Sequence, residues 1–283
     1  MRWERGHQSG NVEDRRGAGG GMGGGRGLQV GLGGLVVLGL LSLALGRDLV
    51  TPLLSGGSVA GGDPNSVAAP GDEELVQFVS FVLDDAQATW RAQLERRGQT
   101  YTDARLVLFT SQVSTACGEA DSGTGPFYCP GDQQVYIDLS FYRELRERFG
   151  APGDFAQAYV LAHEIGHHVQ RLVGTEAQVR ARQDADPSLE NDLSVRMELQ
   201  ADCYAGIWAS STSQRQLLEA GDVEEAMRTA AAIGDDTLQR QAGGRVRPDT
   251  FTHGSSEQRM RWFRLGLSTG QMESCDTFAV PAP

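Results

Sequence analysis

Residues 154–173 read DFAQAYVLAHEIGHHVQRLV, and they carry the strongest structural signal in the chain. Apolar side chains recur every three or four positions, at Phe155, Ala158, Ala162, Ile165, Val169 and Leu172. This spacing predicts an amphipathic helix that buries one face. Asp154 and Gln157 have the spacing of a capping box, and Gly174 is typical of a helix end.

The same helix carries the motif HEIGH at residues 163–167. Histidines four positions apart project from one side of a helix, so His163 and His167 can reach one zinc ion, with Glu164 beside it. In H-E-x-x-H proteins this glutamate is the general base of peptide hydrolysis. The alternative is a helix whose histidines contact carboxylates or solvent. His168 lies about 100° around the helix from His167, so we expect it behind the ligands or on the surface.

Zinc held by two histidines needs a third protein ligand, and a fourth position left to water makes such a site catalytic. Residues 193–208, LSVRMELQADCYAGIW, predict a second helix on which Glu198 and Asp202 lie one turn apart. Small residues that allow close helix packing are Ala201, Ala205, Gly206 and Ala209. We expect Glu198 to be the third ligand and Asp202 to accept a hydrogen bond from the non-ligating nitrogen of His163. The alternative reading is two acids on a solvated face.

Around these two helices the chain predicts an α+β fold that is mainly helical with a small sheet. Residues 74–97 have helical periodicity, ended by Gly98, whereas residues 106–110 and 134–139 have strand composition. Beyond these strands the chain is almost entirely helical in pattern. An exposed edge of the strand at 134–139 could align an extended substrate by strand addition. The polar stretch 175–191 connects the two metal-site helices, and we expect it to cover the cleft.

Composition excludes several classes of protein. A chain of 283 residues with 40% hydrophobic residues can bury a substantial core, which excludes disorder and small disulfide scaffolds. The formal net charge of −12 is opposite to that of a typical nucleic-acid binder. The four cysteines allow three pairings, and we favour Cys117–Cys129 with Cys203–Cys275. Buried free thiols are the alternative.

The N-terminal part of the chain predicts a membrane anchor. Residues 28–45 contain no charge and would form about 27 Å of helix, just enough for a thin hydrocarbon core. A signal peptide cleaved after Ala44 is the alternative. Arginines precede the segment, so the positive-inside rule favours a cytoplasmic N-terminus. The expected organisation is a cytoplasmic Gly/Arg-rich leader at 1–27, a transmembrane anchor at 28–45, a flexible linker at 46–71 and an extracytoplasmic domain at 72–283.

Five segments in order resemble the bacterial, membrane-anchored family of neutral zinc metallopeptidases, within the gluzincin-like zincins. They are residues 11–16 (NVEDRR), 125–130 (GPFYCP), 149–157 (FGAPGDFAQ), 163–170 (HEIGHHVQ) and 198–203 (ELQADC). The resemblance covers nearly the whole chain and shows no departure at the metal residues. It implies a zincin-like fold and Zn²⁺ as the cofactor.

A further fragment, THGSSEQR at 252–259, is similar to a segment of the membrane-associated heat-shock-type zinc proteases. That resemblance implies that His253 hydrogen-bonds the developing oxyanion and that Arg259 orients Glu198 or the substrate. The alternative is a loop histidine before a helix whose N-cap is Ser255 or Ser256.

These observations favour a zinc-dependent endopeptidase, tethered to the cell membrane, that hydrolyses peptide or protein substrates with a zinc-activated water. The rival hypothesis is a non-catalytic, membrane-tethered binding protein stabilised by zinc. Glu164 argues against that rival, because a structural zinc site has no use for a base. No nucleic-acid partner is expected. Neither the natural substrate nor the oligomeric state can be read from the residues.

Overall fold

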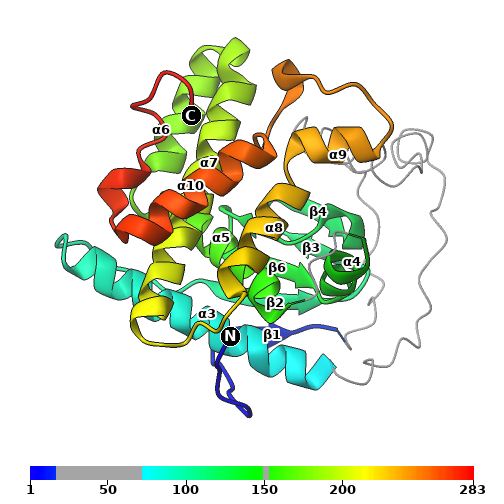
Figure 1. Ribbon diagram of the computed structural model, residues 1–283, viewed down its shortest axis with the longest axis vertical. Helices are drawn as coiled ribbons and strands as arrows, with labels where there is room; N and C mark the ends of the chain where they lie inside the picture. The colour runs from blue at the N-terminus through cyan, green and yellow to red at the C-terminus, as the bar shows by residue number, and fades with distance from the viewer. Residues whose placement is uncertain (17–71, 149–152) are drawn as a thin grey trace.

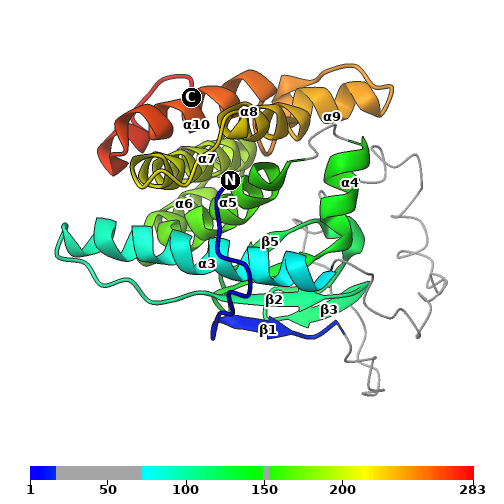
Figure 2. The same ribbon diagram turned by 60° about the horizontal axis from the view of Figure 1, so that its bottom comes forward.

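The computed structural model describes residues 1–16, 72–148 and 153–283. In this part of the chain a four-stranded sheet is covered on one face by α3 and α5, and α7, α8 and α10 lie beyond them, farther from the sheet (Figures 1 and 2). The prediction of an α+β fold, mainly helical with a small sheet, is confirmed. No helix in the described ranges has the length and apolar character needed to span a bilayer.

The helices follow the periodicity of the sequence closely. The helices predicted at 74–97, 154–173 and 193–208 are α3, α5 and α7, although residues 96, 97 and 173 lie just past the helix ends. The helices are α3 (Asp72–Glu95), α4 (Ser140–Arg148), α5 (Asp154–Leu172), α6 (Thr175–Ala185), α7 (Glu190–Gln214), α8 (Asp222–Ala232), α9 (Asp235–Gln241) and α10 (Ser256–Thr269). The capping box predicted from Asp154 and Gln157 is wrong, because the N-cap of α5 is Gly153, without a side-chain cap. The Asp154 carboxylate instead accepts a hydrogen bond from the α-amino group of Met1, 2.7 Å away.

The main sheet has the strand order β1-β2-β6-β5. Its strands are β1 (Val12–Asp14), β2 (Arg105–Phe109), β5 (Phe127–Cys129) and β6 (Gln134–Asp138). β1, β2 and β6 run parallel, and β5 pairs antiparallel with β6. The expectation that residues 134–139 offer an exposed edge is therefore wrong, because β6 is paired on both sides. The edge strand on this side is β5.

A two-stranded hairpin, β3 (Gln112–Thr115) and β4 (Gly118–Asp121), lies between β2 and β5 in the chain. It helps enclose a second, smaller core made of Val107, Phe109, Val113, Cys129 and Tyr136. The Cys117–Cys129 disulfide ties the turn of the hairpin to the edge strand β5. Asp138, at the end of β6, accepts hydrogen bonds from the Ser111 backbone and the Ser122 hydroxyl, which anchor both ends of the hairpin.

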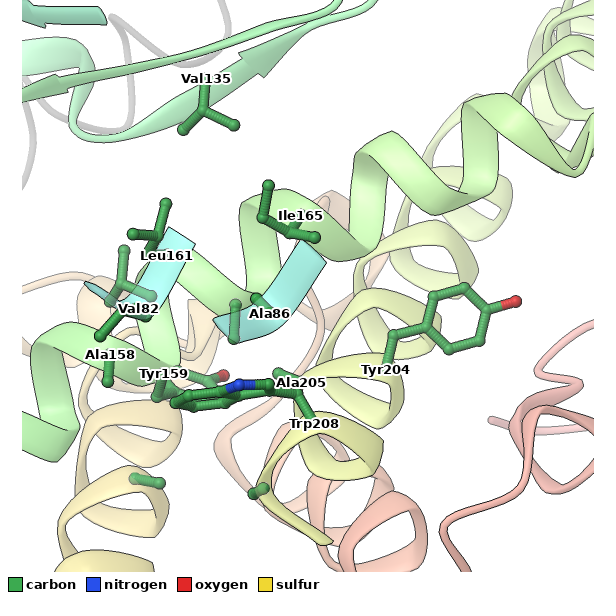
Figure 3. Close-up of a cluster of buried hydrophobic side chains, with 14 of the residues drawn as sticks. Val82, Ala86, Val135, Ala158, Tyr159, Leu161, Ile165, Tyr204, Ala205 and Trp208 are labelled. Carbon is green, nitrogen blue, oxygen red and sulfur yellow. The ribbon is translucent and has the colours of Figure 1, made fainter. Parts of the chain in front are cut away.

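The main core lies between the sheet and the helices and holds the metal-site helices in place. In Figure 3, Val135 of β6 faces Leu161 and Ile165 of α5, while Ala205 and Trp208 of α7 lie on the far side of α5. Every one of these side chains is buried. Rigid packing of this kind fixes the direction in which polar side chains leave the same helices.

Small residues set how closely the helices approach α7. A Cβ atom on Gly166 of α5 would lie 3.1 Å from the Ala201 Cα of α7. Gly206, expected to help α7 approach α5, instead faces α10, where a Cβ would lie 2.1 Å from the Phe263 carbonyl oxygen. The Cys203–Cys275 disulfide fastens α7 to the chain that follows α10. Both predicted disulfides are thus present.

The expected separation of an N-terminal leader from a domain that begins at residue 72 does not match the fold. Residues 1–16 pack on the same body as residues 72–283, with β1 as the outer strand of the sheet beside α3 (Figure 1). β1 pairs over only three residues, and its partner strand β2 lies far along the chain. No local sequence pattern therefore reveals β1 as a strand. The predicted anchor at 28–45 and linker at 46–71 lie outside the described residues.

Candidate metal centre and its cleft

Three predicted ligands converge between α5 and α7. His163 Nε2 lies 3.1 Å from Glu198 Oε2, and His167 Nε2 lies 3.3 Å from Glu198 Oε1. One ligand atom from each residue lies within 4.8 Å of the others, which suits a shared metal ion. The helix spacing explains the geometry, because residues one turn apart on α5 present both imidazoles to the carboxylate from α7.

The other ring nitrogen of each histidine already has a partner. His163 Nδ1 lies 2.8 Å from Asp202 Oδ1, and His167 Nδ1 lies 2.9 Å from Gln170 Oε1. Because each carboxylate or amide oxygen accepts the Nδ1 proton, Nε2 is the nitrogen of each ring that faces Glu198 and is available to a metal ion. Two neutral imidazoles and a carboxylate are the donor set of catalytic zinc sites, so the residues fit the ion that the motif implies.

Asp202 is the centre of a buried polar network. It is fully buried and accepts hydrogen bonds from His163, from the Tyr159 hydroxyl and from the Arg259 guanidinium at 2.8 and 2.9 Å. Burial raises the pKa of Asp202, but Arg259 and His163 outweigh this effect and lower the pKa, so the carboxylate stays charged. Arg259 was expected to orient Glu198 or the substrate. In the structure its partners include Asp202 and Tyr159, so it acts behind His163.

Charged neighbours shift the pKa values of the predicted metal ligands. Burial lowers the pKa of His163, but Asp202 and Glu198 outweigh it and raise the pKa to about 10. Burial also raises the pKa of Glu198, and His167 and His163 reverse that effect to hold the pKa well below its usual range. The site therefore strongly favours positive charge between the two imidazoles and the carboxylate.

Glu164 lines the same cleft as the three ligands and is not among them. The residue is only 7% exposed, and burial raises the pKa of its carboxyl group above that of an ordinary glutamate. A raised pKa makes the carboxylate a stronger base toward a neighbouring water. This is the property that a base next to a metal-bound water requires.

His253 reaches the cleft from the loop before α10 and is held by Asp235, the first residue of α9. Asp235 is 1% exposed and accepts hydrogen bonds from the backbone N–H groups of Thr252, His253 and Gly254. Its other oxygen lies 3.3 Å from His253 Nδ1. Burial lowers the pKa of His253, but Asp235 and Glu198 raise it overall, which favours an imidazole that donates from Nε2. Ser255 caps α10, as one alternative for this segment predicted.

These groups open into one cavity of about 430 Å³. Its apolar wall residues come from β5, α4, α5, α7 and the α8–α9 region: Phe127, Tyr128, Phe141, Val160, Met197, Ile233 and Leu238. The edge strand β5 contributes two of them, so it runs along the cleft. Of the polar stretch at 175–191, which forms α6 and a short 3-10 turn, Glu176 lines the cavity.

His168 differs from what its position on the helix predicts. It is fully buried, with Nδ1 3.0 Å from the Tyr128 hydroxyl and Nε2 2.7 Å from the Thr102 carbonyl oxygen. It therefore lies neither at the metal site nor on the surface. Its contacts tie α5 to β5 and to the segment before β2, which fixes the edge strand relative to the ligands.

Sequence reasoning missed three residues of the site: Tyr159, Gln170 and Asp235. The first two carry a usable signal, because Tyr159 precedes His163 by one helical turn and Gln170 follows His167 by three residues, so both lie near the ligand face. Gln170 also donates to the Met197 carbonyl oxygen on α7, which links the two ligand helices. Asp235 has no local signal, since its partner is in a different loop.

Comparison with protein families gives one match that covers almost the whole chain. The model of the family described as "Putative neutral zinc metallopeptidase" matches residues 1–278, a range that includes the N-terminal strand as well as the metal centre. No solved structure matches the chain significantly.

Two bacterial proteins illustrate how similar the relatives are. The uncharacterized protein YpfJ of Escherichia coli K12 is 49% identical over 284 residues, which cover 98% of this chain and 99% of that protein. The uncharacterized protein Mb2605 of Mycobacterium bovis is 44% identical over 208 residues, 70% of this chain and 68% of its own length.

Proposed function

The chain belongs to the family of putative neutral zinc metallopeptidases, and from this premise we propose that it is a zinc-dependent endopeptidase with a zincin-like fold. His163, His167 and Glu198 hold Zn²⁺ in this proposal. The observation that carries it is the pairing of three converged ligand atoms with a buried, non-ligating Glu164 in one cavity. The rival hypothesis of a purely structural zinc site leaves Glu164 without a role.

The chemistry follows from the positions of the side chains. When bound, Zn²⁺ lowers the pKa of a coordinated water toward about 7 and polarises the scissile carbonyl. Glu164 takes the proton of the attacking water and later delivers it to the leaving nitrogen. His253, oriented by Asp235, donates a hydrogen bond to the oxygen on which negative charge develops. Asp202 and Arg259 keep the His163 ring in the orientation that metal binding needs.

The cleft also supports a proposal about which bonds the enzyme cleaves. An extended peptide can add to β5, the edge strand that lines the cavity, and such pairing binds any main chain regardless of its termini. This supports cleavage of internal bonds. Purified protein incubated with an unfolded protein such as casein should release internal fragments, identified by mass spectrometry, and a zinc chelator should stop their release.

The apolar walls of the cavity predict a preference for a bulky apolar residue next to the scissile bond. Burying such a side chain contributes about 1.5–3 kcal/mol, so kcat/KM should exceed that of the aspartate analogue by roughly 10–100-fold. Kinetics on matched peptides measure this ratio. Leu238→Asn in the cavity wall should reduce the ratio, and Val246→Asn, at an exposed site outside the cavity, should not. Equal rates for both peptides would contradict the prediction.

The dyad of His253 and Asp235 carries a second kinetic prediction. Because His253 acts mainly in the transition state, His253→Ala should lower kcat by about 10²–10³ with KM and zinc content nearly unchanged. Asp235→Asn should show a smaller loss in kcat. Asp236→Asn is the matched control, since Asp236 bonds Ser256 and Arg240 instead of His253. A His253→Ala variant with the wild-type kcat would contradict the catalytic role and leave His253 as a structural residue of the loop.

We further propose that the protein acts at the cell membrane, attached through residues 28–45, with residues 72–283 on the extracytoplasmic side. The apolar sequence of residues 28–45 supports attachment. Two disulfides, which persist in oxidising compartments, support the extracytoplasmic side. Cell fractionation of the full chain tests the attachment.

A further inference from the structure

The first 16 residues form part of the folded body, with backbone contacts along the edge of the sheet. β1 pairs with β2 so that Val12 faces Leu106 and Asp14 faces Leu108. On either side of this pairing, the Leu106 N–H donates to the Asn11 carbonyl and the Arg15 N–H donates to the Leu108 carbonyl, both at 2.8 Å. Parallel pairing of this kind exists only when both strands are in the same aqueous compartment.

Side chains of the same segment enter the helical core and its rim. Met1 is 5% exposed, and the Trp3 ring packs edge-on against Phe78 of α3, with ring centroids 5.4 Å apart. The Ser9 hydroxyl and the His7 ring contact the two oxygens of Asp84, also on α3, at 2.6 and 2.8 Å. Residues 1–16 therefore contact the helices at Met1, cross α3 and end along β2, and they contribute to the main core.

The described residues on either side of 17–71 lie close together. Arg16 lies 3.3 Å from the carboxylate of Asp72, the first residue of α3. A bilayer hydrocarbon core is about 30 Å thick, so groups that form an ion pair cannot lie on opposite sides of it. A single crossing of the bilayer by residues 28–45 would put Arg16 and Asp72 on opposite sides. Residues 46–71 contain prolines, glycines and Asp63 and lack a second apolar run of about 20 residues for a return crossing.

From these contacts we infer that residues 1–16 and 72–283 lie on the same side of the membrane, so residues 28–45 do not separate them by a single crossing. This arrangement replaces the cytoplasmic N-terminus expected from the arginines. That this shared side is the extracytoplasmic one rests on the location proposed above for residues 72–283. The inference does not depend on catalysis.

Cysteine accessibility tests the inference directly in the full-length chain. The four native cysteines are in disulfides, so single changes at exposed positions, Gln8→Cys and Ala185→Cys, add one reactive thiol each. A membrane-impermeant maleimide applied to spheroplasts should label both variants to the same extent, and a native lysate gives the maximum for each. Labelling of Ala185→Cys together with protection of Gln8→Cys until lysis would overturn the inference.

A cross-link supplies a second readout that does not rely on permeability. Ser9→Cys combined with Asp84→Cys should form a disulfide or accept a short bismaleimide in cells, because the native side chains touch. Ser9→Cys combined with Ala185→Cys is the matched control and should not cross-link. The decisive negative result is a first pair that does not cross-link although both single variants are labelled. It would show that residues 1–16 are not docked on α3 and would contradict the inference.

Discussion

A Glu164→Gln variant is expected to bind zinc and fold as the wild type does, while kcat/KM for peptide hydrolysis falls by about 10²–10⁴. Glutamine has the shape of glutamate and cannot take the proton of the attacking water. Because one group serves first as base and then as acid, its loss affects both proton transfers. Hydrolysis of a casein-derived peptide, measured beside zinc content and thermal unfolding, checks the three parts of this expectation.

The cavity offers a matched control for that variant. Glu176 is the carboxylate of α6 that lines the same cavity, and it is held by Arg171 and Arg180. Glu176→Gln should therefore retain kcat/KM within a few fold. If Glu164→Gln hydrolyses the peptide at the wild-type rate, the assigned base is wrong, whatever the zinc content.

The second large effect concerns the metal itself. His163→Ala, His167→Ala and Glu198→Ala should each lose most of the bound zinc in the presence of a mild chelator, since two remaining ligands hold the ion too weakly. Metal analysis of the purified variants measures this loss. Asp202→Asn provides a graded comparison, because it keeps all three ligands and weakens the hydrogen bonds that orient His163 and hold Arg259. It should lower zinc affinity by about 10–100-fold. Full occupancy in Glu198→Ala would place the third ligand elsewhere.

Short-range patterns predicted most of the helical part of the fold. The ligand geometry of His163, His167 and Glu198 could be anticipated because each relation lies within one helical turn or between two helices with clear apolar faces. The disulfide pairing was anticipated as well. Asp202 lies beside His163, as expected from its position one turn after Glu198.

The parts that could not be predicted depend on contacts between distant segments. β1 and β5 have three residues each, too few for a period-2 pattern, and their partners decide that they are strands. The position of β5 made β6 an inner strand and moved the open edge to a different segment. Arg259 was expected to orient Glu198 or the substrate, and its ion pair with the fully buried Asp202 carboxylate could not be read from the sequence. Asp235 gained its role from contacts with a loop that begin seventeen residues later, at Thr252.

Zinc titration of metal-free protein tests the central claim most directly. Wild-type protein stripped with a chelator and dialysed should be inactive, and peptide hydrolysis should rise linearly with added zinc until one equivalent per chain is bound. The Glu164→Gln protein should bind the same one equivalent and remain inactive throughout. Hydrolysis by the stripped wild type, or by Glu164→Gln at one equivalent, at the rate of the untreated enzyme would contradict the assignment of a zinc endopeptidase centred on these residues.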